Sequence, residues 1–264
     1  MNYFRLFTGI FLLCSLLPIR LFAFDELCDA DIRSLSLGRL NALSYNIQNP
    51  ASTAFLKEKT IGVSVFNRFS MSELNTKSLF CSFPNPIIDA AAELSAYGYD
   101  EYQLLGIRIG LSKRVSEKFA IGVNVAYINE NSVLLEESNS LLTADAGLFW
   151  RINEKFDFAL ATKNLIRTVS SLPQNCYVGV TIRVSENFHT LLEGGSDFRG
   201  ENSLSAGAEY FILEKFTIRA GFRNNPKTPS LGFAYKIGSV TTETCFLMHP
   251  VLGLSSGIAL KWNL

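Results

Sequence analysis

Large apolar residues fall at every second position along much of the chain. In residues 119–127 (FAIGVNVAY), large apolar side chains occupy alternate positions, and small or polar ones lie between them. The same alternation holds in residues 216–223 (FTIRAGFR), 231–237 (LGFAYKI) and, with Ser256 as the one interruption, 252–264 (LGLSSGIALKWNL). Because successive side chains of a strand point to opposite faces, this period of two predicts β-strands with one strongly apolar face.

The second face of these strands decides between two architectures. In a soluble sheet the face that meets water is rich in charge, whereas here it is mostly Gly, Ala and Ser with scattered charges. Small residues suit the crowded interior of a barrel, and large apolar residues suit a surface turned to lipid. We therefore predict an all-β fold, a transmembrane antiparallel up-and-down β-barrel. A soluble periplasmic β-protein with its large apolar residues inside is the alternative.

A short turn motif repeats four times. It reads SEKF, NEKF, SENF and LEKF at residues 116–119, 153–156, 185–188 and 213–216, with the glutamates 37, 32 and 28 residues apart. These intervals fit one hairpin with a tight turn and a longer return loop. The phenylalanine opens the next strand each time, which favours an aromatic girdle at a membrane interface over a hydrophobic residue packed beneath a hairpin of a soluble barrel.

Counting the alternating segments gives about 14 strands. We expect them near residues 59–70, 77–83, 87–97, 102–114, 118–129, 141–152, 155–164, 176–184, 187–196, 203–212, 215–223, 229–238, 239–247 and 252–264. An even count places both termini of the chain on the periplasmic side, and the repeated turns then lie on that side too. The longer loops, near 129–140 and 165–175, then lie on the other side.

The N-terminus divides into two parts. Residues 1–23 combine a weakly basic start, an apolar run and Ala23 before acidic residues, which is typical of a cleaved signal peptide. Residues 24–58 alternate poorly and contain Pro50, so they form an N-terminal segment that is either periplasmic or inserted into the lumen. We predict that residues 59–264 form an outer-membrane barrel.

Composition excludes several classes of protein. Hydrophobic residues make up 48% of the chain and charged residues only 18%, yet beyond the N-terminus no apolar stretch is long enough for a membrane-spanning helix. Cleavage after residue 23 removes two arginines and no acid, which leaves 22 basic and 24 acidic residues. This balance gives no reason to expect nucleic acid as a partner.

The sequence offers no candidate for catalysis, a cofactor or a metal. His189 and His249 stand 60 residues apart without an evident carboxylate partner, and no hydrolase or phosphate-binding motif is present. We therefore expect that the protein is not an enzyme. The mature chain keeps Cys28, Cys81, Cys176 and Cys245, which allow three disulfide connectivities. Cys81 and Cys176 lie in apolar strand patterns, so we expect them to be buried as small hydrophobic residues.

Charged residues on the inward face have two interpretations. By strand parity they are Arg108, Asp157, Lys163, Arg183, Glu193, Glu209, Arg219, Arg223 and Lys236. A mixed set of signs favours a hydrogen-bonded network that holds a filled barrel. The alternatives are charged rings of a conducting pore, or an anionic head-group site at Arg219 and Arg223, which lie four residues apart on one strand.

The segment around Asn49-Pro50-Ala51 resembles the start of the FadL-like outer-membrane barrels. That group includes long-chain fatty-acid transporters and the PorV/PorQ proteins of type IX secretion. Gln48 before the triplet resembles the PorQ-like form, whereas Ser52 stands where a glycine is usual. The resemblance implies 14 strands around an N-terminal hatch that contains Asn49, Pro50 and Ala51. A capping turn before the first strand is the alternative role. Leu264 departs from the usual aromatic last residue of bacterial barrels, and Trp262 partly compensates.

Two functions follow as expectations. The first is passage of small hydrophobic molecules through a FadL-like barrel in the outer membrane of a Gram-negative bacterium. The second is a non-transporting structural or secretion-associated scaffold. The expected partners are outer-membrane lipid, the barrel-assembly machinery and a small hydrophobic ligand. An apolar lumen pocket that contacts residues 30–55 favours transport, whereas a lumen closed by Arg–Glu pairs favours a scaffold.

Overall fold

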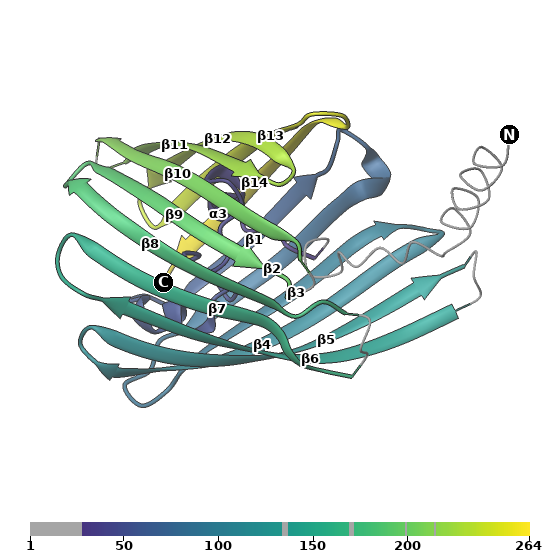
Figure 1. Ribbon diagram of the computed structural model, residues 1–264, viewed down its shortest axis with the longest axis horizontal. Helices are drawn as coiled ribbons and strands as arrows, with labels where there is room; N and C mark the ends of the chain where they lie inside the picture. The colour runs from purple at the N-terminus through teal and green to yellow at the C-terminus, as the bar shows by residue number, and fades with distance from the viewer. Residues whose placement is uncertain (1–27, 134–136, 169–171, 199, 214) are drawn as a thin grey trace, which may run out of the picture.

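The chain forms a closed barrel of fourteen antiparallel strands, which confirms the predicted fold class (Figure 1). The computed structural model describes residues 28–133, 137–168, 172–198, 200–213 and 215–264, so the predicted signal peptide lies outside the described residues. Each strand pairs with its neighbours in the chain, and the first pairs with the last in a register that joins Thr60 to Asn263 and Asn67 to Ser256.

The strand bounds follow the predicted alternation closely. The strands are β1 (Thr60–Asn67), β2 (Asn75–Phe83), β3 (Asp89–Tyr99), β4 (Tyr102–Ser116), β5 (Phe119–Ser132), β6 (Glu137–Arg151), β7 (Phe156–Arg167), β8 (Asn175–Ser185), β9 (Phe188–Ser196), β10 (Asn202–Leu213), β11 (Phe216–Asn224), β12 (Lys227–Ile237), β13 (Val240–His249) and β14 (Gly253–Asn263). The predicted loop at 129–140 is largely strand, because β5 and β6 pair as far as Ser132 and Glu137. Ladder hydrogen bonds use the backbone, so this polar stretch extends the hairpin despite its lack of apolar alternation.

The two faces of the wall differ as the alternation predicts. On β5, Val123 and Val125 are 54% and 51% exposed, whereas Asn124 and Ala126 between and beside them are buried. Most large apolar side chains on the other strands are exposed in the same way, whereas a few, such as Phe66, Phe149 and Leu191, are buried in the lumen. The barrel therefore presents an apolar outer surface and a lumen lined mainly by small and polar residues.

The repeated turns all lie at one end of the barrel. Their phenylalanines open β5, β7, β9 and β11 with side chains on the outer face, at the end where Leu264 N–H donates to the Lys59 carbonyl over 2.7 Å. Neighbouring aromatic side chains contact these phenylalanines; for example, the ring centroids of Phe188 and Tyr210 lie 6.3 Å apart. We call this set the aromatic rim. Its assignment as a membrane-interface girdle stays a prediction.

The expectation for two cysteines is wrong. Cys81 and Cys176 are only half-buried, because they share the outward parity of exposed neighbours such as Ile61 and Val178. Cys28 and Cys245 are buried instead, and none of the four described cysteines is in a disulfide. Large apolar neighbours in the sequence therefore indicate the outer surface here, not a core.

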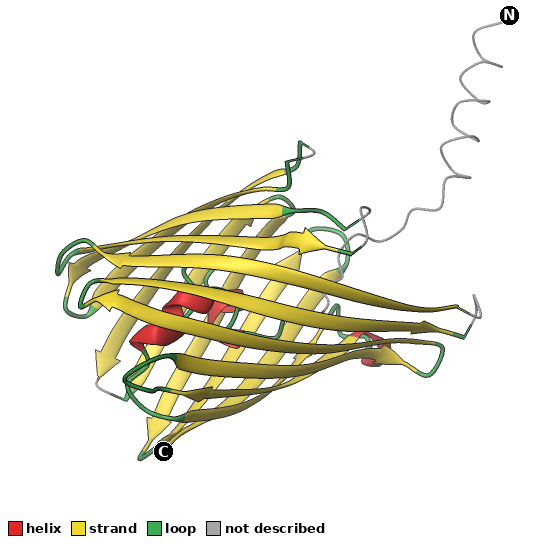
Figure 2. Cartoon of the chain, turned by 90° about the horizontal axis from the view of Figure 1, so that it is seen from below, coloured by secondary structure: helices red, strands yellow, loops and turns green. Residues whose placement is uncertain are grey.

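Residues 28–55, which we call the plug, occupy the lumen. Figure 2 shows their short helices enclosed by the strands. Helix α3 (Ile32–Ser36) contacts β11 to β14, and the 3-10 helix η1 (Pro50–Phe55) contacts β3 to β6. A further 3-10 turn, η2 (Ser72–Leu74), lies between β1 and β2. Within the described ranges, no helix is long and apolar enough to cross a membrane.

Candidate functional site

The plug rests against wall positions that have no side chain. A Cβ added at any of seven inward-facing glycines would come closer than 3.0 Å to a plug atom. These are Gly122, Gly147, Gly179, Gly207, Gly221, Gly232 and Gly257. They belong to seven different strands, so the plug is seated around most of the wall. The sequence shows these glycines as part of a small-residue face but does not show what occupies the space beside them.

The Asn49-Pro50-Ala51 triplet lies inside the lumen and also forms a helix cap. Asn49 is the N-cap of η1, its side-chain oxygen accepting from the Ala51 N–H at 3.1 Å, and Pro50 takes the first helical position. The Asn49 amide donates to the Ala42 carbonyl at 2.7 Å. Pro50 packs over Gly122 and Gly147, which are paired across β5 and β6. The geometry therefore combines the capping turn with lumen insertion, and a gating role stays a prediction.

A chain of ion pairs runs from the plug through the wall and back to the plug. In order, its members are Arg33, Glu209, Arg219, Glu243, Lys261 and Asp31. Arg33 and Asp31 belong to the plug, and the four between them lie on β10, β11, β13 and β14. Successive N···O distances are 2.9, 2.8, 3.0, 2.7 and 3.9 Å. Since the signs alternate, each buried charge has an opposite neighbour, which offsets its loss of hydration.

Other predicted lumen charges also have partners. Arg108 lies 3.2 Å from Glu93 and 3.8 Å from Asp145, and Arg183 pairs with Asp157. Further contacts link wall to plug. Lys163 donates to Gln48, and Glu193 accepts the Asn41 and Leu43 N–H groups at 2.7 and 3.1 Å. Lys236 is exposed.

Arg219 and Arg223 do not form one head-group site. Arg219 is held by Glu209 and Glu243 within the ion-pair chain. Arg223 instead donates to the Asn225 carbonyl at 2.9 Å and lines a cavity at the end of the lumen. Sharing one face of a strand is therefore not enough to place two side chains in the same site.

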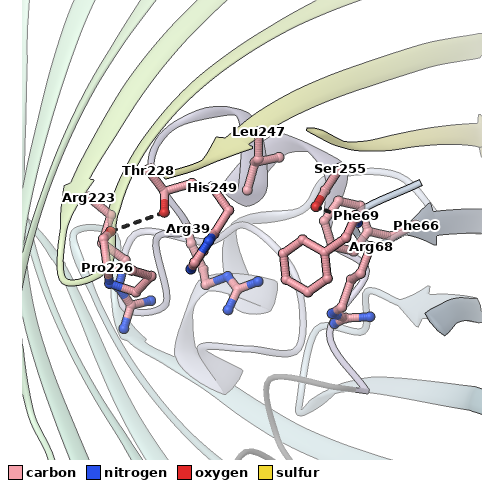
Figure 3. A pocket seen from close by; sticks show the side chains of 11 residues that line it. Arg39, Phe66, Arg68, Phe69, Arg223, Pro226, Thr228, Leu247, His249 and Ser255 are labelled. Carbon is pink, nitrogen blue, oxygen red and sulfur yellow. Dashed lines mark hydrogen bonds between the residues drawn. The ribbon is translucent and has the colours of Figure 1, made fainter. Parts of the chain in front are cut away.

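This cavity, which we call the mouth cavity, lies at the end of the barrel opposite the aromatic rim. It has a volume of about 230 Å³ and is lined by the plug and by residues at the ends of β1, β11, β12, β13 and β14 (Figure 3). Phe66, Phe69 and Leu247 supply apolar surface. The polar part consists of Thr228, Ser255 and four cationic or titratable side chains, namely Arg39, Arg68, Arg223 and His249. No carboxylate is among its eleven lining residues.

Local contacts hold the cavity walls in place. Phe69 N–H donates to Ser255 Oγ at 3.0 Å, and its ring meets His249 edge-on at 5.6 Å. His249 Nδ1 accepts the Val251 and Leu252 N–H groups at 3.2 and 3.1 Å, which places the proton of a neutral imidazole on Nε2. The lining residues come from segments far apart in the chain, so no local motif could reveal this cavity.

Comparison with solved structures identifies the class of fold. The CymD monoaromatic hydrocarbon channel superposes with a TM-score of 0.67 at 12% identity, over 90% of this chain and 98% of that one. The Pseudomonas putida toluene transporter TodX gives 0.61 at 11% identity, and a Pseudomonas aeruginosa FadL homologue gives 0.59 at 11%, each over 86% of this chain and 95% of theirs. No protein-family model and no curated protein matches the sequence. The chain therefore has the fold of FadL-like channels.

Proposed function

We propose that this protein is an outer-membrane barrel of a Gram-negative bacterium that passes small hydrophobic molecules. The mouth cavity carries the proposal, because a solute entering there meets the rings of Phe66 and Phe69 and then the plug residues Gly38 and Arg39. Concave sites with apolar walls and few polar groups are the usual form of small-ligand sites. The apolar outer surface, which suits contact with outer-membrane lipid, and the shared fold support the location. Export by a cleaved signal peptide (residues 1–23) and insertion by the barrel-assembly machinery belong to the same proposal.

In this proposal the plug acts as a hatch. The ion-pair chain and the glycine seats fix it across the lumen, so passage requires that part of the plug rearranges. Asn49, Pro50 and Ala51 anchor its η1 end against β5 and β6. Similar solved structures are channels and transporters, which supports a channel rather than an enzyme.

One observation favours the scaffold alternative. Buried Arg–Glu pairs occupy the lumen beside α3, where a permanently open path would need free space. A filled barrel of this kind can serve as a membrane platform for other proteins. Movement of the plug separates the two functions, since only the transporter needs it.

A reversible cross-link tests this movement. Thr53 Oγ1 of the plug and Ser112 Oγ of β4 lie 2.8 Å apart. The double substitution Thr53→Cys and Ser112→Cys therefore places two thiols close enough to form a disulfide. The native cysteines are replaced by serine, so that no other disulfide can form. Folding is first verified by faster migration of the unboiled protein from outer membranes on a detergent gel. Uptake of radiolabelled toluene by intact cells is then compared with cells that carry the empty vector.

Transport through a mobile hatch predicts uptake above the vector control, loss of that uptake on oxidation, and recovery on reduction. Each single-cysteine variant controls for the substitutions themselves. Uptake equal to the vector control would refute transport and leave the scaffold. Uptake that oxidation does not change would show that the η1 end of the plug stays fixed during passage.

A further inference from the structure

The end of the barrel that carries the aromatic rim, which we call the rim end, has more exposed lysines than exposed acids. Among the described side chains, its exposed lysines are Lys57, Lys59, Lys113, Lys118, Lys155, Lys215 and Lys236, and its exposed acids are Glu58, Glu117, Glu154 and Glu186. At the opposite end, the exposed lysines are Lys77 and Lys227, and the exposed acids are Glu73, Asp100, Glu101 and Glu201. Positive charge is therefore concentrated at one end of the wall.

Two of the rim-end lysines border the apolar outer face. Lys113 of β4 pairs in register with Ile121 of β5, whose side chain is 47% exposed on that face. Lys59 immediately precedes β1, and by alternation its side chain lies on the same face as that of Ile61. Lysine stems lie along apolar surface while the ammonium group stays in polar surroundings. These lysines thus place ammonium groups at the edge of the apolar wall.

The two tryptophans of the chain lie at the same level. Trp150 and Trp262 are 45% and 52% exposed on the outer face, and they pair in register with Phe119 and Ile61. Because the Lys59 carbonyl accepts the Leu264 N–H, Lys59 and Trp262 are diagonal neighbours on one face, a separation that long side chains can bridge. Tryptophan on a lipid-facing surface lies at the level of the headgroups. The ammonium group of Lys59 is then at headgroup level too.

Resting on the membrane location in the proposed function, we infer that the rim end binds anionic phospholipids in preference to zwitterionic ones. The ammonium groups of Lys59 and Lys113 pair with the phosphate, and the acyl chains pack on the apolar wall beside them. A zwitterionic headgroup carries its own cation next to the phosphate, which weakens this attraction. One lipid molecule covers both the charge and the adjoining apolar surface, whereas an acidic protein would match the charge alone.

The native tryptophans report on the lipid beside them, because bromine on an acyl chain quenches tryptophan fluorescence on contact. The full-length protein carrying Trp150→Phe, which leaves Trp262 as the single reporter, is inserted into phosphatidylcholine vesicles. Brominated phosphatidylglycerol or brominated phosphatidylcholine is then mixed in. We expect phosphatidylglycerol to be preferred about fivefold at about 0.1 M salt, the effect of one lysine near an anionic surface. At about 1 M salt the screening length falls to about 3 Å, and the preference should disappear.

Lys59→Gln should reduce the preference at Trp262 to about twofold or less. Lys77→Gln is the matched control and should leave it unchanged, because Lys77 is an exposed lysine on the outer face of β2 at the opposite end. If Lys59→Gln inserts poorly, Lys59→Arg, which keeps the charge, must retain the preference.

Equal quenching by the two brominated lipids would overturn the inference and leave the membrane location intact. A preference that persists at about 1 M salt, or that falls equally in the Lys77 variant, would show that Lys59 is not its source. Absence of quenching by either lipid would instead refute the lipid-facing surface, and with it the proposed function.

Discussion

The contact between Arg33 and Glu209 should hold the plug in the lumen, and a double-mutant cycle can measure its energy. Arg33→Met and Glu209→Gln, separately and together, form a double-mutant cycle across the boundary between plug and wall. Met keeps most of the apolar length of arginine, and Gln keeps the shape of glutamate, so both changes remove charge more than volume. The coupling free energy then isolates the contact from other effects of each substitution.

The magnitude follows from the geometry. Arg33 Nη2 and Nε lie 2.9 and 3.3 Å from the two carboxylate oxygens of Glu209, and the side chains are 13% and 5% exposed. Hydrogen bonds to a charged group contribute about 1.5–3 kcal/mol each. In Arg33→Met, Glu209 still pairs with Arg219. In Glu209→Gln, Arg33 still contacts the Leu43 carbonyl and the Tyr45 ring. We therefore expect a coupling free energy of about 2 kcal/mol, near the low end of what double-mutant cycles give for close charge pairs.

Urea unfolding of the barrel in lipid vesicles, followed by the gel mobility of unboiled samples, gives the four free energies. Hydrogen exchange of amides 31–37 reports on the plug alone and should speed up in both single variants. A control cycle uses Tyr102→Phe and Glu130→Gln, a wall pair at 3.0 Å that should couple without changing plug exchange. A coupling below about 0.5 kcal/mol, within the error of additivity, would refute the claim that this pair holds the plug.

Two further predictions concern the two faces of the wall. Gly221→Ala should destabilise the folded barrel by about 1–3 kcal/mol through overpacking against plug backbone, whereas Gly194→Ala, where nothing lies within 4 Å, should be nearly neutral in the same urea assay. Val125→Lys, on the outer face near the middle of β5, should cost about 2–4 kcal/mol in vesicles, and Val115→Lys, near the strand end, about 0–1 kcal/mol. Equal costs for the two lysines would contradict a lipid-facing surface.

Local pattern was enough to predict the wall. The alternation in residues 119–127 depends only on the geometry of a single strand, so it gave both the strand and the outward face of Val123. The turn motifs placed the starts of β5, β7, β9 and β11 for the same reason. The pattern failed at 129–140, where backbone pairing continues through polar residues that side-chain alternation cannot distinguish from a loop.

Contacts between distant segments were beyond local pattern. Parity placed Glu209 and Arg219 in the lumen, but the plug partner Arg33 lies 176 residues from Glu209 in the chain. The cap of η1 was readable in Asn49-Pro50, yet its seat on Gly122 and Gly147 depends on how two strands meet the plug. The mouth cavity is assembled from several such segments at once. The sequence therefore predicted that Arg223 faces the lumen but did not predict the cavity that it lines.

The short connection between the plug and the wall has a consequence for how firmly the lumen stays closed. Residues 56–59 join η1 to β1 and reach at most about 14 Å when extended. The plug is in effect a ligand tethered beside its own binding site, at a local concentration on the order of millimolar. A plug segment that leaves its glycine seats is thus recaptured in a unimolecular step. Weakening a single contact should make such excursions more frequent without letting the plug escape.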